Sequence, residues 1–233
     1  PLVEAMTLER LAGQTERYGR VRLWGSVGFI VSVMALGGLL DALPIAAVLW
    51  ACLFILASVL ASALTLEDSK VSSGVTAPPV GGQFRQPVVM ALLAACFFMS
   101  VAHGPLYVFY SIHLVNHGYD KLSVGMLWSL GVVAEILVFM AMPRLMRHFS
   151  LRGILLASFT LAVLRFVLIG WAADSLLVLL FAQLLHGATF GAYHAGAMAA
   201  LIRWFEPAQQ ARVQGLYGSI SFGAGGMVGG LLS

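Results

Sequence analysis

Two ionisable residues, Glu135 and Arg165, lie inside long apolar stretches of the sequence. A charged side chain at the centre of a bilayer costs at least about 2.5 kcal/mol, so each of these charges needs a partner or a function. At about 1.5 Å per helical residue, Glu135 lies about 12 Å and Arg165 about 18 Å from the same side of the membrane. We therefore expect the two side chains to meet across adjacent helices. The pair is either a proton-coupling site, in which protonation of Glu135 breaks an ion pair, or a permanent structural salt bridge.

A second set of polar residues lies in another apolar stretch at spacings of three, three and four, which places them on one helical face. Its members are Gln183, His186, Thr189 and Tyr193. A polar face inside a membrane span borders either a cavity or a neighbouring helix. The set could therefore bind a substrate, with His186 exchanging protons, or it could only form hydrogen bonds between helices.

The run His103-Gly104-Pro105 lies within a further apolar stretch, where the proline is expected to bend or break a helix. Broken helices near the midplane of the membrane are where transporters bind substrates. Tyr107 and Tyr110 follow one and two turns later and offer an aromatic wall with polar tips. His103 and Tyr107 are thus candidate substrate-binding residues, although ordinary aromatic packing would equally explain either tyrosine.

Glu4 and Arg22 form a fourth candidate site, near the ends of two adjacent spans. A guanidinium group can bind a carboxylate with two hydrogen bonds, or it can bind paired hydroxyl groups with help from a neighbouring carboxylate. Arg22 has an alternative explanation as one more cation that fixes the orientation of the protein in the membrane.

The composition shows which kind of fold must position these residues. Of the 233 residues, 60% are hydrophobic and 10% are charged, and the mean hydropathy is +0.93. Soluble domains carry about 25% charged residues, so an ordinary soluble enzyme is excluded. The net charge of +3 is too small for nucleic-acid binding. We predict an all-α polytopic membrane protein, a helix bundle that is embedded in the lipid bilayer.

Stretches of about 20 mostly apolar residues predict the membrane spans. There are seven, over residues 23–40, 45–66, 87–115, 122–143, 153–172, 175–202 and 213–233, and the first residues resemble the end of an eighth. Glycine is dense in the last span. Its pairs Gly225/Gly229 and Gly226/Gly230 have the spacing that lets membrane helices approach closely.

The loops between the spans indicate orientation and domains. Every second loop carries arginines, whereas the loops near Asp41, Asp120 and Asp174 carry none. The arginine-rich side is expected to be cytoplasmic. Residues 67–86 are rich in Ser, Gly and Pro and predict a cytoplasmic linker between the remainder of an N-terminal bundle, 1–66, and a C-terminal bundle, 87–233.

An internal repeat supports two duplicated halves. Arg20-Val21 and Trp24-Gly25-Ser26 recur as Arg212-Val213 and Tyr217-Gly218-Ser219, an offset of about 192 residues, with an even number of crossings between them. Such parallel repeats occur in secondary transporters. Two six-helix halves imply a fragment that lacks the first four helices and the last.

Three motifs occur in the order of a known family. They are YGRVRLWGSVGF at residues 18–29, LWSLGVVAE at 127–135 and QLLHGATFGAYHAGAM at 183–198. They resemble the major facilitator superfamily, and within it the 3-phenylpropionate permease group, which is related to the oligosaccharide:proton symporters. The resemblance implies a 12-helix fold, covered here from the end of helix 4 to helix 11, in the cytoplasmic (inner) membrane of a bacterium.

The resemblance also implies roles for single residues. Glu135 and Arg165 match the positions of a coupling glutamate and an arginine in the related sugar symporters. Glu4 and Arg22 match a substrate-binding glutamate and arginine there.

The helix that carries His186 departs from the lactose-type pattern. His186 matches a histidine of that pattern, but Gln183 replaces a lysine and Thr189 replaces the proton-carrying glutamate. Glu135 is then the best remaining proton carrier.

These observations predict a proton symporter for a small organic solute, most simply an aromatic carboxylate such as phenylpropionate. A sugar or nucleoside symporter is the alternative, and a non-transporting receptor or scaffold is a third hypothesis. The sequence has no nucleophile–base pair, P-loop motif or Cys/His ligand set, so we expect no enzyme activity, no cofactor and no metal.

Overall fold

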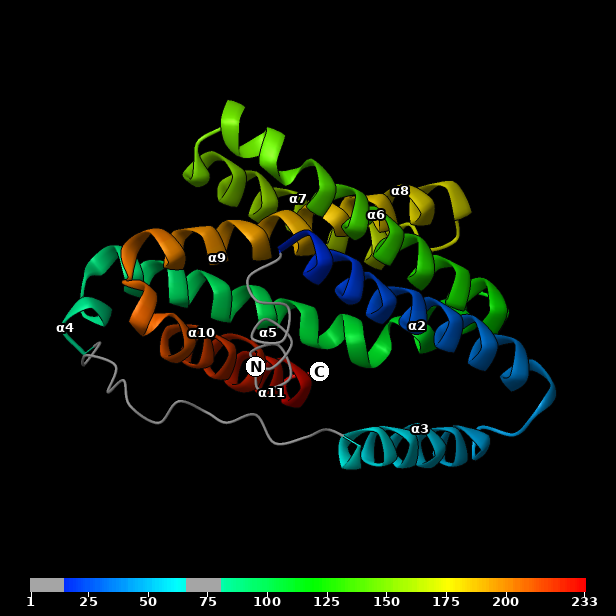
Figure 1. The fold of residues 1–233 in the computed structure, drawn as a ribbon. Coiled ribbons are helices and arrows are strands. Elements are labelled where there is room, and N and C mark those ends of the chain that lie inside the picture. The colour runs from blue at the N-terminus through cyan, green and yellow to red at the C-terminus, as the bar shows by residue number, and fades with distance from the viewer. Residues whose placement is uncertain (1–14, 66–80) are drawn as a thin grey trace. The chain divides into compact units, whose positions relative to one another are not determined.

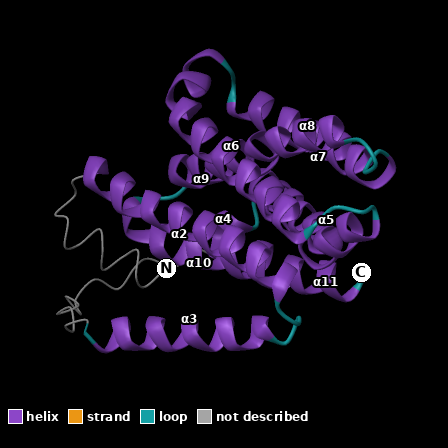
Figure 2. Ribbon diagram, turned by 90° about the vertical axis from the view of Figure 1, so that its right-hand side faces the viewer, coloured by secondary structure: helices purple, strands orange, loops and turns teal. Residues whose placement is uncertain are grey.

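The computed structural model describes residues 15–65 and 81–233. Figures 1 and 2 show helices joined by short loops, and these residues contain no strand. The predicted all-α architecture is confirmed. Glu4 and most of the predicted linker, residues 67–86, lie outside the described residues, so the division into two bundles at that linker stays a prediction.

The helices have the following bounds, with η1 and η3 denoting π-helical segments and η2 a 3₁₀ turn. They are α2 (Thr15–Ala42), α3 (Ala47–Leu64), α4 (Gly81–Phe84), α5 (Pro87–Asn116), α6 (Lys121–His148), α7 (Leu151–Trp171), α8 (Leu176–His186), η1 (Gly187–Ala192), α9 (Tyr193–Trp204), η2 (Pro207–Gln209), α10 (Gln210–Gly218), η3 (Ser219–Gly225) and α11 (Gly226–Leu231).

Six helical stretches of the described chain are long and apolar enough to cross a membrane. They are Trp24–Ala42, Ala47–Leu64, Pro87–Asn116, Lys121–His148, Leu151–Trp171 and Leu176–Trp204, which match six of the seven predicted spans. The seventh, 213–233, is helical as α10, η3 and α11, but it is not among the six. Its many glycines lower its hydropathy.

The structure divides into two compact units, one of residues 1–75 with 120–129 and the other of residues 76–119 with 130–233. In the first unit, α2 approaches the start of α6 closely, because a Cβ added at Gly37 would lie 2.7 Å from the Lys121 carbonyl oxygen. The Asp41 carboxylate accepts hydrogen bonds from the Lys121 and Leu122 amides at 3.2 and 3.3 Å. It thereby satisfies free amides at the N-terminus of α6.

Helix α3 has no buried residue, so its apolar surface suits contact with lipid.

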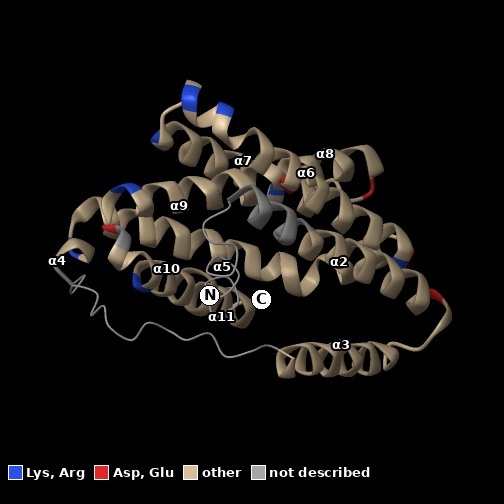
Figure 3. Ribbon diagram, viewed as in Figure 1, with Lys and Arg blue, Asp and Glu red and all other residues tan. Residues whose placement is uncertain are grey.

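The second unit holds the main hydrophobic core, formed between α5, α7, α9 and α10. The core includes Val89, Cys96, Tyr193, Leu201, Val213 and Tyr217, each at most 2% exposed. Figure 3 shows most of the cations of this unit at one end of its helices. Arg165 is an exception, because it is a buried residue within α7. Only a residue with internal partners can hold a charge at that depth.

The sequence predicted a bend or a break at Gly104-Pro105, and the break is wrong, because α5 is one continuous helix from Pro87 to Asn116. The bend stays a prediction. Proline has no N–H for the carbonyl four residues earlier, that of Val101. Gly229 of α11 packs against this same carbonyl, since a Cβ added at Gly229 would overlap the Val101 oxygen. A neighbouring helix thus covers the backbone group that the proline frees, which is how membrane helices tolerate proline.

Only one of the two predicted glycine pairs makes a close helix contact. A Cβ at Gly225 would lie 2.8 Å from the Phe97 carbonyl oxygen, and Gly229 is equally crowded, so this pair faces α5. A Cβ at Gly226 or Gly230 would meet no atom within 4 Å. The second pair therefore borders open space, which is part of the cavity described below.

Candidate functional site

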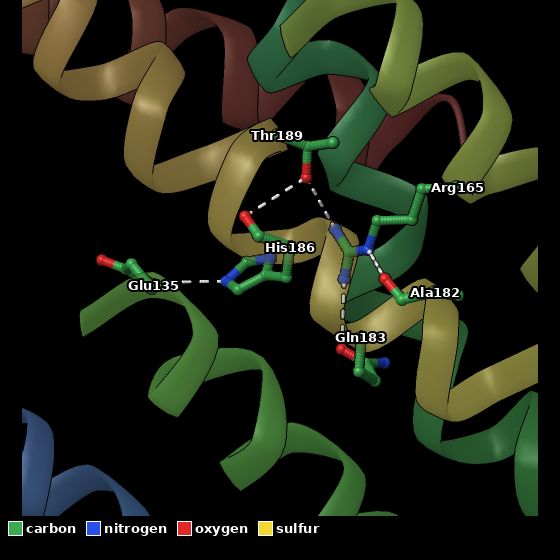
Figure 4. A network of polar contacts seen from close by, with 6 residues as sticks. All are labelled: Glu135, Arg165, Ala182, Gln183, His186 and Thr189. Carbon is green, nitrogen blue, oxygen red and sulfur yellow. Dashed lines mark hydrogen bonds and ion pairs between the residues drawn. The ribbon is translucent and has the colours of Figure 1, made fainter. Parts of the chain in front are cut away.

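Arg165 of α7 is the centre of a buried polar network (Figure 4). Its side chain is fully buried. Nε donates to the Ala182 carbonyl at 3.1 Å, Nη2 donates to Oε1 of Gln183 at 3.4 Å, and Nη1 lies 3.5 Å from the hydroxyl of Thr189. All three partners are neutral, and they come from α8 and η1. The network therefore holds a positive charge inside the bundle with no carboxylate in contact among the described residues.

The network continues from Gln183 to a further helix, α5, and from Thr189 back to the end of α8. The Gln183 amide nitrogen donates to the Tyr110 hydroxyl of α5, and the Thr189 hydroxyl donates to the His186 carbonyl at 3.4 Å. Gln183, Thr189 and Tyr110 are all at most 2% exposed. Through these partners, Arg165 connects α7 with α5 and η1.

The expected ion pair between Glu135 and Arg165 is not formed. Instead, the Glu135 carboxylate lies 3.6 Å from Nε2 of His186, and Figure 4 shows the imidazole between Glu135 and Arg165. The donors of Arg165 are directed to the neutral acceptors of α8 and η1. The positions of Glu135 and Arg165 along their spans predicted that both charges lie in the interior, but they did not indicate that His186 lies between them.

Glycines bring α6 close enough for this contact. A Cβ at Gly187 would lie 2.6 Å from the Ala134 carbonyl oxygen, and a Cβ at Gly191 would lie 3.3 Å from Cγ of Glu135. The two helices therefore pack backbone to backbone beside His186. Nδ1 of His186 is buried and has no hydrogen-bond partner.

The predicted polar face of Gln183, His186, Thr189 and Tyr193 is buried throughout, but its members reach different neighbours. Gln183 and Thr189 contact Arg165, His186 contacts Glu135, and the Tyr193 hydroxyl donates to the Cys96 carbonyl of α5 at 3.4 Å. The reason is η1, a π-helical segment that interrupts the α-helical spacing between His186 and Tyr193. Such segments are frequent at functional sites.

A cavity of about 180 Å³ lies beside the network, between α5, α9, η1, η3 and α11. His103, Tyr107, Phe190, Tyr193 and Phe222 are among the residues that line it. His103 is 3% exposed. The structure therefore brings His103, Tyr107 and Tyr193 to one cavity, while Gln183 and Thr189 belong to the Arg165 network. That these residues bind a substrate stays a prediction.

Phe190 connects the cavity with the network, and the sequence did not indicate this residue. Phe190 stacks on His186 with ring centroids 5.4 Å apart, and its centroid lies 6.4 Å from that of His103. Tyr110, which was expected with Tyr107 to form an aromatic wall, is the partner of Gln183, and the sequence did not predict that bond. Nothing in the sequence pattern distinguishes Phe190 or Phe222 from ordinary apolar residues.

Two predicted residues cannot be placed in the site. Glu4 lies outside the described residues, and Arg22 belongs to α2 with its side chain outside the described part of the chain. Their predicted role in substrate binding stays a prediction. The described residues contain no group of three His, Cys, Asp or Glu side chains that could hold a metal ion.

Comparison with known proteins shows the family. The chain matches the MFS_1 like family over residues 1–233. It is 32% identical over 218 residues to a probable 3-phenylpropionic acid transporter of Escherichia coli (strain K12), a match that covers 88% of this chain and 55% of the relative. It is 27% identical over 181 residues to the maltose permease of Geobacillus stearothermophilus, covering 75% of this chain and 44% of that protein.

The chain thus spans about half the length of these relatives. No solved structure matches it. The family match includes all three motifs on which the resemblance was based, and the six apolar helices agree with a multi-pass membrane protein. The chain therefore belongs to the MFS_1 like family, a major facilitator family of transporters, as its sequence predicted.

Proposed function

We propose that the full-length protein is a proton-coupled secondary transporter that moves a small organic solute across the cytoplasmic membrane by alternating access. The observation that carries this proposal is the Glu135–His186 contact of 3.6 Å, next to a fully buried Arg165 with neutral partners. Ionisable groups inside membrane spans mark proton and substrate pathways. Glu135, His186 and Arg165 are three such groups within the second unit.

Glu135 and His186 are the proton-exchanging pair in this proposal. A carboxyl group and an imidazole can each carry a proton, and a contact between them depends on which of them holds it. When Glu135 takes up a proton, it loses its charge attraction to a protonated His186, and the packing of α6 on η1 is weakened. A proton then biases the conformational equilibrium, because it binds the two states with different affinity.

Arg165 has a positioning role. Its charge is always present, and its fork of donors fixes α8 and η1 to α7 through Ala182, Gln183 and Thr189. Its positive charge makes a second positive charge on His186 costly unless Glu135 is ionised. Proton binding at His186 is thereby coupled to the state of Glu135.

For the substrate we propose a small aromatic carboxylate. The aromatic lining of the cavity supports this choice, as does the printed name of the Escherichia coli relative. A sugar is the second candidate. It is supported by the similarity to a maltose permease and by the predicted Glu4–Arg22 pair, because a carboxylate beside an arginine suits hydroxyl groups better than an anion.

Flux measurements on the purified full-length protein in proteoliposomes test this function. We expect 3-phenylpropionate to drive proton uptake and to be accumulated when a proton gradient is imposed. Inhibition by sugars alone would replace the aromatic acid with a sugar. A protein that binds these compounds without any flux would be a receptor, and the transport proposal would be rejected.

A further inference from the structure

His103 carries a buried nitrogen that the protein leaves without a partner. The imidazole lines the cavity, is 3% exposed and has no hydrogen-bond partner at Nε2. Buried polar atoms in native proteins are almost always hydrogen-bonded, and an unmade bond of this kind costs free energy. A polar atom that is buried beside an open cavity and has no partner in the protein suits a bond to a ligand.

The backbone determines which kind of partner Nε2 can take. Nδ1 of His103 lies 2.8 Å from the carbonyl oxygen of Met99, and a carbonyl can only accept. Nδ1 therefore holds the proton of the neutral ring, and Nε2 presents a lone pair. An ionised carboxylate has no proton to offer such an atom. A hydroxyl group does.

The cavity has the size and walls for one aromatic ring. An apolar cavity of about 150 Å³ binds benzene, and the cavity beside His103 measures about 180 Å³. Its wall includes the rings of Tyr107, Phe190 and Phe222. The small surplus over benzene accommodates a ring substituent, but not a second ring, so a disaccharide does not fit inside.

Aromatic contacts hold His103 in this orientation. Its ring meets Phe166 edge to face, with centroids 5.0 Å apart and an interplanar angle of 78°, and the Tyr107 ring lies 6.0 Å away. A ring fixed in this way loses little conformational entropy when a ligand binds. The acceptor is therefore preorganised.

We propose that this cavity binds a phenolic ring and that Nε2 of His103 accepts a hydrogen bond from the ring hydroxyl. The inference rests on the proposed function in that the ring belongs to the transported aromatic acid. It names the preferred substrate class as ring-hydroxylated aromatic acids. The carboxylate of such a substrate lies outside this cavity.

The test compares three probes, 3-phenylpropionate and its 3-hydroxyphenyl and 4-hydroxyphenyl analogues, by titration calorimetry on the purified full-length protein. We expect at least one hydroxylated probe to bind about tenfold more tightly than the unsubstituted one. In His103→Phe, which keeps a ring but removes the acceptor, this ratio should fall to about one. In His103→Gln, whose amide oxygen can accept, part of the preference should return.

Equal affinity for all three probes, no binding of any probe, or a preference that survives in His103→Phe would overturn the inference.

A second variant covers the case in which His103 variants do not fold. Gly226 lines the cavity and has open space at its Cβ position, so Gly226→Leu should fill the cavity and weaken all three probes by about tenfold or more. The control is Met227→Leu, at an exposed neighbouring position. Unchanged affinities in Gly226→Leu would exclude ring binding there.

Transport measurements separate this inference from the proposed function. If the probes bind with a preference that depends on His103 but no probe is transported, the cavity assignment stands and the transport function fails. If 3-phenylpropionate is transported and the hydroxyl group makes no difference to binding, the transport function stands and the cavity assignment fails.

Discussion

The carboxylate of Glu135 lies 3.6 Å from the imidazole of His186 and makes no ion pair with Arg165, whose guanidinium contacts only neutral groups of the described chain. The proton-exchanging unit that this geometry supports is thus a carboxylate and an imidazole on α6 and α8. In the proposed mechanism, Arg165 acts through its fixed charge and through the helices that it joins.

Replacing Glu135 by glutamine should uncouple transport from the proton gradient. The glutamine amide cannot ionise, so the site no longer gains and loses a proton, while the substrate can still drive the conformational change. In proteoliposomes we expect the accumulation ratio to fall to about one and the rate of substrate exchange to stay within about threefold of that of the unmodified protein.

The control for this variant is Glu206→Gln, at an exposed carboxylate in the loop after α9. It makes the same chemical change away from the network and should accumulate substrate normally. Uphill accumulation by Glu135→Gln at the level of this control would remove Glu135 from the coupling mechanism.

Replacing Arg165 by lysine should destabilise the protein even though the charge is kept. A lysine ammonium group lacks the planar fork that reaches Ala182, Gln183 and Thr189 together. Leaving buried acceptors unsatisfied costs about 1–3 kcal/mol each, so the thermal unfolding temperature in detergent should drop. Arg203→Lys, at an exposed position of α9, should leave that temperature unchanged. Equal unfolding temperatures for the two variants would contradict the network.

Two glycines of α11 should respond differently to the same substitution. A Cβ at Gly229 would overlap the Val101 oxygen, whereas a Cβ at Gly226 would meet nothing within 4 Å. Gly229→Ala must push α11 from α5 and should cost about 1–3 kcal/mol. Gly226→Ala should be neutral or stabilising, because alanine favours a helix. Thermal unfolding of both variants measures the difference, and comparable stabilities would disprove the close contact.

The stability of the first turn of α6 should depend on pH through the Asp120 carboxyl group. A hydrogen bond from the Ser123 backbone amide, at 2.6 Å, holds the pKa of the Asp120 carboxyl below its usual value. The pKa of Asp120 is lower in the folded than in the unfolded protein. The stabilisation by this hydrogen bond is therefore fully present above the unfolded-state pKa, and it is lost as the pH falls through the folded-state pKa. Hydrogen exchange of the first turn of α6 should therefore be faster in Asp120→Ala than in the unmodified protein at neutral pH, and the difference should vanish in acid. A difference that persists in acid would rule out the ionised cap.

The sequence determined the features that depend on local composition. Apolar runs predicted the six long helices within a few residues. The rarity of charges at membrane depth singled out Glu135 and Arg165, and the helical spacing of polar residues singled out His186. These inferences succeed because the bilayer requires apolar side chains and internally bonded backbone, whichever helices are neighbours. The motifs around residues 18–29, 127–135 and 183–198 were specific enough to indicate the family.

Tertiary packing decided which of these residues meet. Gly187 lets α6 approach η1 until Glu135 reaches His186, and Gly229 covers the Val101 carbonyl so that α5 stays continuous through Pro105. The π-helical turn at η1 directs Tyr193 toward α5 and away from Arg165. Spacing along one helix specifies only a direction around its own axis. The partner found in that direction depends on the rotation and distance of the neighbouring helix, which are set by side chains far away in the sequence.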